Sequence, residues 1–183
     1  LGIGNAIMDV IAPVSDADLE AMDIAKGGMT LVDQDRALEL HGKFAASGAH
    51  PREIADGSAA NTLVGIAKLD VKAAYIGKVA NDDLGGRFAK GMVDAGVHYD
   101  TPPLEGGEAS ARCLIAVTPD GERSMSTFLG ASVMFGKEDV IKSLIQDSKI
   151  IYMEGYLFDR DEAKAAFVKA AEIAQAAGRE VAL

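Results

Sequence analysis

The chain has 183 residues, of which 49% are hydrophobic and 5% aromatic, so it is long enough to bury a sizeable core. Its formal net charge is −10 and it contains no basic run, which argues against a nucleic-acid or anionic-membrane partner. The single cysteine, Cys113, excludes an internal disulfide and favours a cytoplasmic setting. No apolar stretch is long enough to span a bilayer, and we identify no signal peptide.

Both ends of the sequence read as core strands. Leu1-Gly2-Ile3-Gly4 resembles the last part of a strand, and Glu180-Val181-Ala182-Leu183 resembles the first part of one. A domain rarely begins and ends inside core strands. We therefore expect the chain to be truncated at both ends and to belong to a longer protein.

The first predicted strand covers residues 3–11 and is interrupted by polar residues. Asn5 and Asp9 are four positions apart, so they would share one face of a regular strand. Burying two unpaired polar side chains costs about 1–3 kcal/mol or more each, so both need partners. A ligand can provide them, and so can the backbone of a turn or a helix cap.

A dinucleotide-binding fingerprint is a second interpretation of this stretch, and the sequence argues against it. Gly2 and Gly4 have the spacing of the first two glycines in G-x-G-x-x-G, but Ile7 stands at the third position. No short turn into a helix follows. We therefore reject the Rossmann interpretation.

The next elements are a short helix and strand, followed by a longer helix. Ser15-Asp16-Ala17-Asp18 predicts the capped start of a helix within residues 14–22, and residues 29–32 read as a strand. Asp33 is expected to cap a helix over residues 34–46. This helix carries one apolar face, formed by Ala37, Leu40 and Phe44.

A small turn, Asp56-Gly57-Ser58-Ala59-Ala60-Asn61, runs directly into an apolar helix over residues 62–69. Ser58 is expected to be the N-cap, with Asn61 at the third helical position, and Gly57 lets the backbone turn without a side chain in the way. Such a helix start directs unpaired N–H groups and small polar side chains at one spot, which suits a neutral polyhydroxylated ligand or an anion. The simpler interpretation is a helix cap without a ligand.

Residues 72–79 predict a strand, and Asp82 or Asp83 starts the next helix, which ends at Gly96. Two β-rich runs, residues 112–118 and 122–129, then flank Pro119-Asp120-Gly121, which predicts a half-exposed antiparallel hairpin. A hairpin of this kind in an α/β chain often forms a flap. Arg123, at the end of its turn, is either a solvated charge or a cation that the flap brings to a phosphate.

The α/β alternation then resumes with a strand over residues 149–153 and a helix over residues 161–177. Glu154-Gly155-Tyr156 follows the strand at its C-terminal end, where open α/β sheets place their ligand sites. The repeated β-α-β pattern predicts an α/β fold with a parallel sheet.

Taken together, these blocks resemble the N-terminal portion of a ribokinase-like (PfkB-type) carbohydrate kinase, in the branch that contains adenosine kinases. The blocks occur in the family's order and cover nearly the whole chain: Gly2 to Asp9, Gly57 to Thr62, Gly77 to Gly85, Asp120 to Arg123, and the strand end at Glu154-Gly155-Tyr156. The resemblance implies a parallel central sheet flanked by helices, with a small β-sheet lid. It implies that residues 1–183 are the N-terminal part of one kinase domain, with lid segments at about residues 12–32 and 110–129.

The resemblance also implies a function. It implies ATP-dependent phosphorylation of a primary hydroxyl on a nucleoside or sugar, with an adenosine-type nucleoside favoured and Mg²⁺ as the metal. Alternatives are a free-sugar kinase for ribose, fructose or a ketodeoxy sugar acid, and a sugar- or nucleoside-binding module without activity. A homodimer could form through the lid. By the same resemblance the substrate-binding residues are Asn5, Asp9, Gly57, Ser58, Asn61 and Tyr156, and Arg123 is the lid residue that approaches the phosphates.

Two departures from the family pattern stand out. The family usually has a second glycine where this chain has Asp56, and a carboxylate there could contact a hydroxyl or repel a phosphorylated product. The family's catalytic aspartate, its ATP-binding segment and its metal-linked motif belong to the C-terminal half. We therefore expect no catalytic base and no metal ligand in these residues, and no kinase activity from this chain alone.

Overall fold

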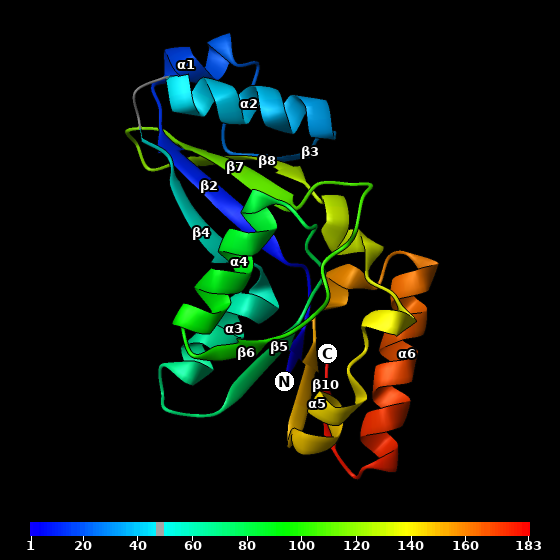
Figure 1. Cartoon of the computed structure of the whole chain (residues 1–183). Coiled ribbons are helices and arrows are strands. Elements are labelled where there is room, and N and C mark those ends of the chain that lie inside the picture. The colour runs from blue at the N-terminus through cyan, green and yellow to red at the C-terminus, as the bar shows by residue number, and fades with distance from the viewer. Residues whose placement is uncertain (47–49) are drawn as a thin grey trace.

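The computed structural model describes residues 1–46 and 50–183, and these residues form two five-stranded sheets (Figure 1). The central sheet is parallel throughout and has the order β10-β9-β1-β5-β6. Its strands are β1 (Gly2–Ile3), β5 (Ala73–Ile76), β6 (Val97–Tyr99), β9 (Ile150–Met153) and β10 (Glu180–Ala182). The predicted parallel α/β sheet is confirmed.

The second sheet, here called the lid sheet, has the order β3-β8-β7-β2-β4 and mixes parallel with antiparallel pairs. Its strands are β2 (Ile7–Pro13), β3 (Met29–Leu31), β4 (Arg52–Asp56), β7 (Ala111–Val117) and β8 (Arg123–Phe128). The predicted hairpin is the antiparallel pair β7–β8. It is more buried than expected, because α1 (Asp16–Ala21) and α2 (Gln34–Ala46) cover one face of the lid sheet.

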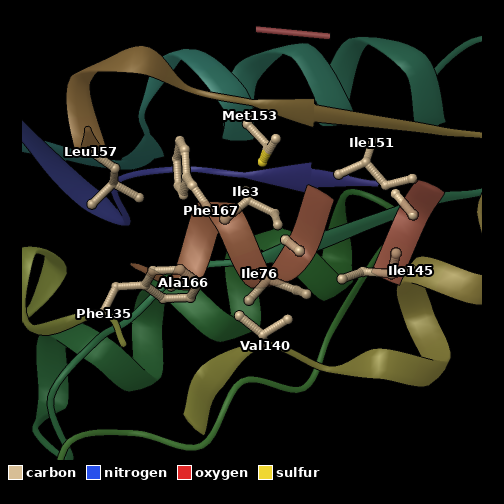
Figure 2. Close-up of a cluster of buried hydrophobic side chains, with 12 residues drawn as sticks. Ile3, Ile76, Phe135, Val140, Ile145, Ile151, Met153, Leu157, Ala166 and Phe167 are labelled. Carbon is tan, nitrogen blue, oxygen red and sulfur yellow. The ribbon is translucent and has the colours of Figure 1, made fainter. Parts of the chain in front are cut away.

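Helices pack on both faces of the central sheet. One face packs against α5 (Lys142–Asp147) and α6 (Asp161–Ala176), through the cluster that includes Ile3, Ile76 and Phe167 (Figure 2). The other face packs against α3 (Ser58–Ala67) and α4 (Asp83–Asp94), through a cluster that includes Tyr75 and Phe88. Successive strand residues such as Tyr75 and Ile76 thus point to opposite faces, as a sheet that is buried on both sides requires.

Short 3₁₀ helices connect several elements, namely η1 (Gly130–Met134), η2 (Lys137–Asp139) and η3 (Gly155–Leu157). The longer elements follow the sequence pattern closely. The helix expected over residues 34–46 is α2, and Asp82 caps α4 by accepting a hydrogen bond from the Gly85 amide at 2.7 Å. Within residues 1–46 and 50–183, no helix is both long and apolar enough to cross a membrane.

The chain passes from the central sheet to the lid sheet within one short linker, Gly4-Asn5-Ala6. The sequence predicted a single strand over residues 3–11, and the structure has two, β1 and β2. The reason lies in the linker's hydrogen bonds. The Gly4 amide donates to the Ile76 carbonyl at 3.2 Å, and the Asn5 amide donates to the Glu154 carboxylate at 3.1 Å. These bonds bind the linker to the ends of the central strands, so β2 leaves that sheet and begins the lid.

Candidate functional site

Three segments meet where the central sheet gives way to the lid sheet. They are the β1–β2 linker, the start of α3 and the residue that follows β9, Glu154. The Glu154 carboxylate is buried and accepts hydrogen bonds from the amides of Asn5, at 3.1 Å, and Ala59, at 3.4 Å. We call this meeting point the junction. It brings together the polar residues that the sequence placed in three distant motifs.

Two glycines let the backbones approach closely at the junction. Gly57 has a φ of +118°, and a Cβ atom there would lie 2.3 Å from the Asn5 carbonyl oxygen. A Cβ atom on Gly4 would lie 2.1 Å from a carboxylate oxygen of Glu154. Neither position has room for a side chain, and the backbone at Gly57 is one that other residues rarely adopt. The expectation that Gly57 makes the turn is confirmed.

The start of α3 differs from the prediction. Ser58 is the first residue of α3, and Gly57 is the N-cap, so the predicted Ser58 cap is wrong. Asn61 is consequently the fourth helical residue, and its amide donates to the Gly57 carbonyl at 2.8 Å. The Asn61 side chain donates instead to the Asp56 carboxylate. The capping rule failed here because Gly57, with its positive φ, ends the turn one residue earlier than a serine cap would.

Two polar side chains, one in the β1–β2 linker and one in β2, are buried. Asn5 is 4% exposed, and its Oδ1 atom has no hydrogen-bond partner in the part of the chain that the structure describes. Asp9 is 8% exposed; burial, together with the negative charge of Asp56, raises the pKa of Asp9 to about 7, against the opposing charge of Arg123. Because Asn5 lies in the linker and Asp9 in β2, the two do not share a face of one strand, as the sequence had suggested.

Asp9 lies on the face of the lid sheet that α1 and α2 leave uncovered. The register pairs Ile7 with Asp56 and Asp9 with Cys113, so Asp9 and Asp56 stand diagonally on the same face. Arg123 is on this face too, at the far end of the hairpin, where it pairs with Val117. Two carboxylates and one guanidinium therefore project from one face of the lid sheet.

Tyr156 lies at the other side of the junction, in η3, and is 79% exposed. It lines an open hollow of about 360 Å³ together with Ser58, Tyr152, Glu154 and Gly155. A larger hollow, of about 510 Å³, lies between η2 and the start of α6 and contains none of the predicted site residues. We place the candidate site at the junction because the unpartnered Oδ1 atom of Asn5 is in its linker and the buried carboxylate of Asp9 follows in β2.

Glu154 and Asp56 were missed as site residues by the sequence reasoning. Glu154 had a recognisable signal, since it is a charged residue at the C-terminal end of an apolar strand. Its two amide contacts, to residues 149 and 95 positions away, have no signature in the sequence. Asp56 was recognised only as a departure from a pattern, and its bond to Asn61 depends on where α3 starts.

Comparison with known proteins gives a consistent result. The sequence model for the "pfkB family carbohydrate kinase" matches residues 19–183. The crystal structure of adenosine kinase from Sinorhizobium meliloti superposes with a TM-score of 0.85 and 48% identity, over 98% of this chain and 54% of that one. A probable sugar kinase protein from Rhizobium etli CFN 42 superposes with a TM-score of 0.84 and 44% identity, over 98% and 53%.

Among curated proteins, the probable chloroplastic fructokinase-6 of Arabidopsis thaliana is 30% identical over 124 residues, which are 67% of this chain and 32% of that protein. The chain spans about half the length of the solved structures and about a third of this relative. The similarity to the solved structures, in contrast, extends over nearly all of the chain.

Proposed function

The chain belongs to the pfkB family of carbohydrate kinases, and from this premise we propose that the protein transfers a phosphoryl group from ATP to a primary hydroxyl of a nucleoside or sugar. The observation that carries this proposal is the pair of buried acceptor groups in the β1–β2 linker and in β2. The Asn5 Oδ1 atom lacks a partner among the described residues, and the Asp9 carboxylate is buried. Groups of this kind are satisfied by the hydroxyls of a polyol.

On this proposal each junction residue has a defined task. Asp9 accepts hydrogen bonds from two neighbouring hydroxyls, and charge-assisted bonds of this kind are worth about 1.5–3 kcal/mol each. Asn5 accepts another through Oδ1. Gly57 and Ser58 bring the backbone and a hydroxyl close to the same ligand. Asn61, whose side chain is hydrogen-bonded to Asp56, lies beside that ligand.

The lid sheet supplies the rest of the acceptor site. Arg123 stands on the same face as Asp9, so its guanidinium can approach the phosphates when the lid closes over the acceptor. Closure also expels water, which would otherwise accept the phosphoryl group.

An adenosine-type nucleoside is the acceptor that we favour. The adenosine kinase from S. meliloti shares 48% identity with this chain, and Tyr156 is an exposed aromatic beside Ser58 on which a base can stack. A free-sugar kinase is the second candidate. The similarity to a probable sugar kinase and a probable fructokinase favours it, and Tyr156 would then serve packing.

We assign residues 1–183 to the N-terminal part of one kinase domain, with lid segments at about residues 12–32 and 110–129. The chain spans about half of the solved kinases, which supports this division. The catalytic base and the segment that binds ATP and Mg²⁺ then belong to sequence beyond these residues. Bound Mg²⁺-ATP supplies the phosphoryl group and neutralises its charge. Residues 1–183 alone should release no ADP from ATP.

A coupled ADP-release assay tests the function, using the protein with all the sequence that its gene encodes. Mg²⁺-ATP is supplied with adenosine, other nucleosides, ribose, fructose or sugar acids. Turnover of adenosine alone supports the nucleoside kinase, and turnover of a free sugar supports the second candidate. Binding of an acceptor without turnover would instead identify a binding module and overturn the kinase proposal.

The same assay tests the acceptor site. Replacing Asp9 with alanine removes the carboxylate that we assign to the hydroxyls. We expect kcat/KM for the acceptor to fall about 10- to 1,000-fold. An unchanged kcat/KM would remove Asp9 from the site.

A further inference from the structure

Asp56 brings a second carboxylate to the acceptor site. It is the last residue of β4 and directly precedes Gly57. One of its carboxylate oxygens accepts a hydrogen bond from the Asn61 side chain, and the strand register places it on the same face of the lid sheet as Asp9. The residue is half-buried, so its charge is only partly screened by water.

Side-chain oxygens of Asn5, Asp9 and Asp56, three residues near the start of β2 and the end of β4, need hydrogen-bond donors. The buried Oδ1 of Asn5 has no partner in residues 1–46 and 50–183. Asp9 and the remaining oxygen of Asp56 accept hydrogen bonds when ionised and cannot donate them. Hydroxyl groups of a neutral ligand can satisfy these atoms, whereas a carboxylate on the ligand cannot donate to them and is repelled by the charge of Asp56 and by that of Asp9 when Asp9 is ionised.

We propose that Asp56 is a specificity-determining residue, which restricts the acceptor to neutral polyhydroxylated compounds and excludes sugar acids. This rests on the proposed kinase function and narrows it. Asp56 acts directly, through its charge, and indirectly, by holding the side chain of Asn61. The opposing cation is Arg123, whose charge also acts on Asp9; we assign its guanidinium to the phosphates rather than to the acceptor.

The test is a comparison of acceptors in the Asp56→Asn variant of the complete protein. Asparagine keeps the size of the side chain and an oxygen that can accept from Asn61, but removes the charge. We measure kcat/KM with Mg²⁺-ATP for adenosine, ribose and fructose, and for 2-keto-3-deoxygluconate as the acid. In the variant, the ratio of kcat/KM for the acid to kcat/KM for the best neutral acceptor should rise at least tenfold.

A matched control is Asp147→Asn, which removes the same charge from the end of α5. This helix precedes β9, so Asp147 lies near the opposite, N-terminal edge of the central sheet. Its acid-to-neutral ratio should equal that of the parent protein. If both variants raise the ratio equally, the effect comes from net charge and the proposal fails. If Asp56→Asn does not fold, Asp56→Gly removes the charge together with the bond to Asn61 and introduces the glycine that is usual in the family.

The pH dependence of KM gives a readout that a merely structural role would not move. The groups that face Asp9 from neighbouring strands are Asp56 on β4, Cys113 on β7 and Arg123 on β8. Asp56 favours the protonated form of Asp9, so the Asp56→Asn variant should reach its low KM for a neutral acceptor at a lower pH than the parent does. Asp147→Asn should leave the profile unchanged.

The outcomes separate this inference from the function on which it rests. A parent protein that phosphorylates no acceptor overturns both proposals. A parent that phosphorylates neutral acceptors, with the same acid-to-neutral ratio in the Asp56→Asn variant, leaves the kinase standing and overturns the role of Asp56. A parent that uses the sugar acid as well as the neutral acceptor overturns that role too.

Discussion

Asp9 is a residue that we assign to ligand binding, and its ionised form makes the folded chain less stable. Burial is the main cause that raises its pKa to about 7, and Asp56 adds to it. The carboxyl therefore binds its proton more tightly in the folded chain than in the unfolded one, where the ordinary value is 3.8. The contribution of the protonated Asp9 carboxyl to the free energy of unfolding is fully present below the pKa of the unfolded chain. It is lost as pH rises through the pKa of the folded chain.

Replacing Asp9 with asparagine should therefore stabilise the protein at high pH. We expect the free energy of unfolding in the absence of ligand to rise by about 1–2 kcal/mol at pH 8, and by less at pH 5. Urea unfolding at the two pH values measures this. Asp147→Asn is the control, and its effect should not change between the two pH values. A gain that is equal at pH 5 and pH 8 would show that the titration of Asp9 is not its cause.

The Glu154 carboxylate connects the segments that meet at the junction. Its carboxylate accepts from two backbone amides that belong to different segments, and Asn5 and Ala59 would lose that partner in Glu154→Ala. We expect a loss of about 1–3 kcal/mol in unfolding free energy and a raised KM for the acceptor, because Asn5 would no longer be held in place. Glu154→Gln retains an acceptor oxygen and should restore most of both. If glutamine restores stability but not KM, the charge itself is required.

At the scale of elements, the start of α3 depends on Gly57. In Gly57→Ala the new Cβ would meet the Asn5 carbonyl, and the φ of +118° would be strained. We expect a loss of about 2–4 kcal/mol in unfolding free energy and weaker acceptor binding. Gly42→Ala in α2 is the control, since apart from its chain neighbours and the backbone of its own helix no described atom lies within 4 Å of the position of its Cβ. That substitution should stabilise the protein by about 0.5–1 kcal/mol.

Elements with strong local patterns could be predicted from the sequence, and those decided by contacts between segments could not. The apolar spacing of α2 and the Pro-Asp-Gly turn between β7 and β8 are local features, and both elements were found. The break between β1 and β2 depends on the Glu154 carboxylate, which is 149 positions from Asn5. Ser58 was assigned as a cap for the same reason, because the residues around Gly57 do not indicate that its backbone lies against the backbone of Asn5.

At the scale of the molecule, a cluster of charged residues connects the lid to the helices of the central sheet. His41 in α2 lies between Glu53 in β4, at 3.4 Å, and Arg112 in β7, whose guanidinium lies 3.2 Å from its Nδ1 atom. Glu53 also pairs with Arg87 in α4, which flanks the central sheet. Burial, followed by the charge of Arg112, lowers the pKa of His41. The stabilising effect of its neutral form is therefore present above the unfolded pKa and is lost as pH falls through the folded one.

His41→Gln should make the protein less sensitive to mild acid. Glutamine cannot gain the proton that would face Arg112, so the variant should lose less unfolding free energy than the parent between pH 7.5 and pH 5.5. His98→Gln, at an exposed position in β6, is the control and should behave like the parent. Equal losses in His41→Gln and the parent would exclude His41 as the titrating group.

The short linker between β1 and β2 makes this chain dependent on the order of its synthesis. Ile3 pairs with Ile76 and with Met153, and β2 pairs first with β4 and only later with β7. At about 5–20 residues per second, a ribosome needs roughly 5–20 s to extend the chain from β2 to β7. After β4 has been made and before β7 has been made, the apolar β2 has β4 as a neighbour while its other edge stays unpaired. Residues 7–13, the segment that later carries Asp9 into the site, therefore keep an exposed edge until β7 has been made.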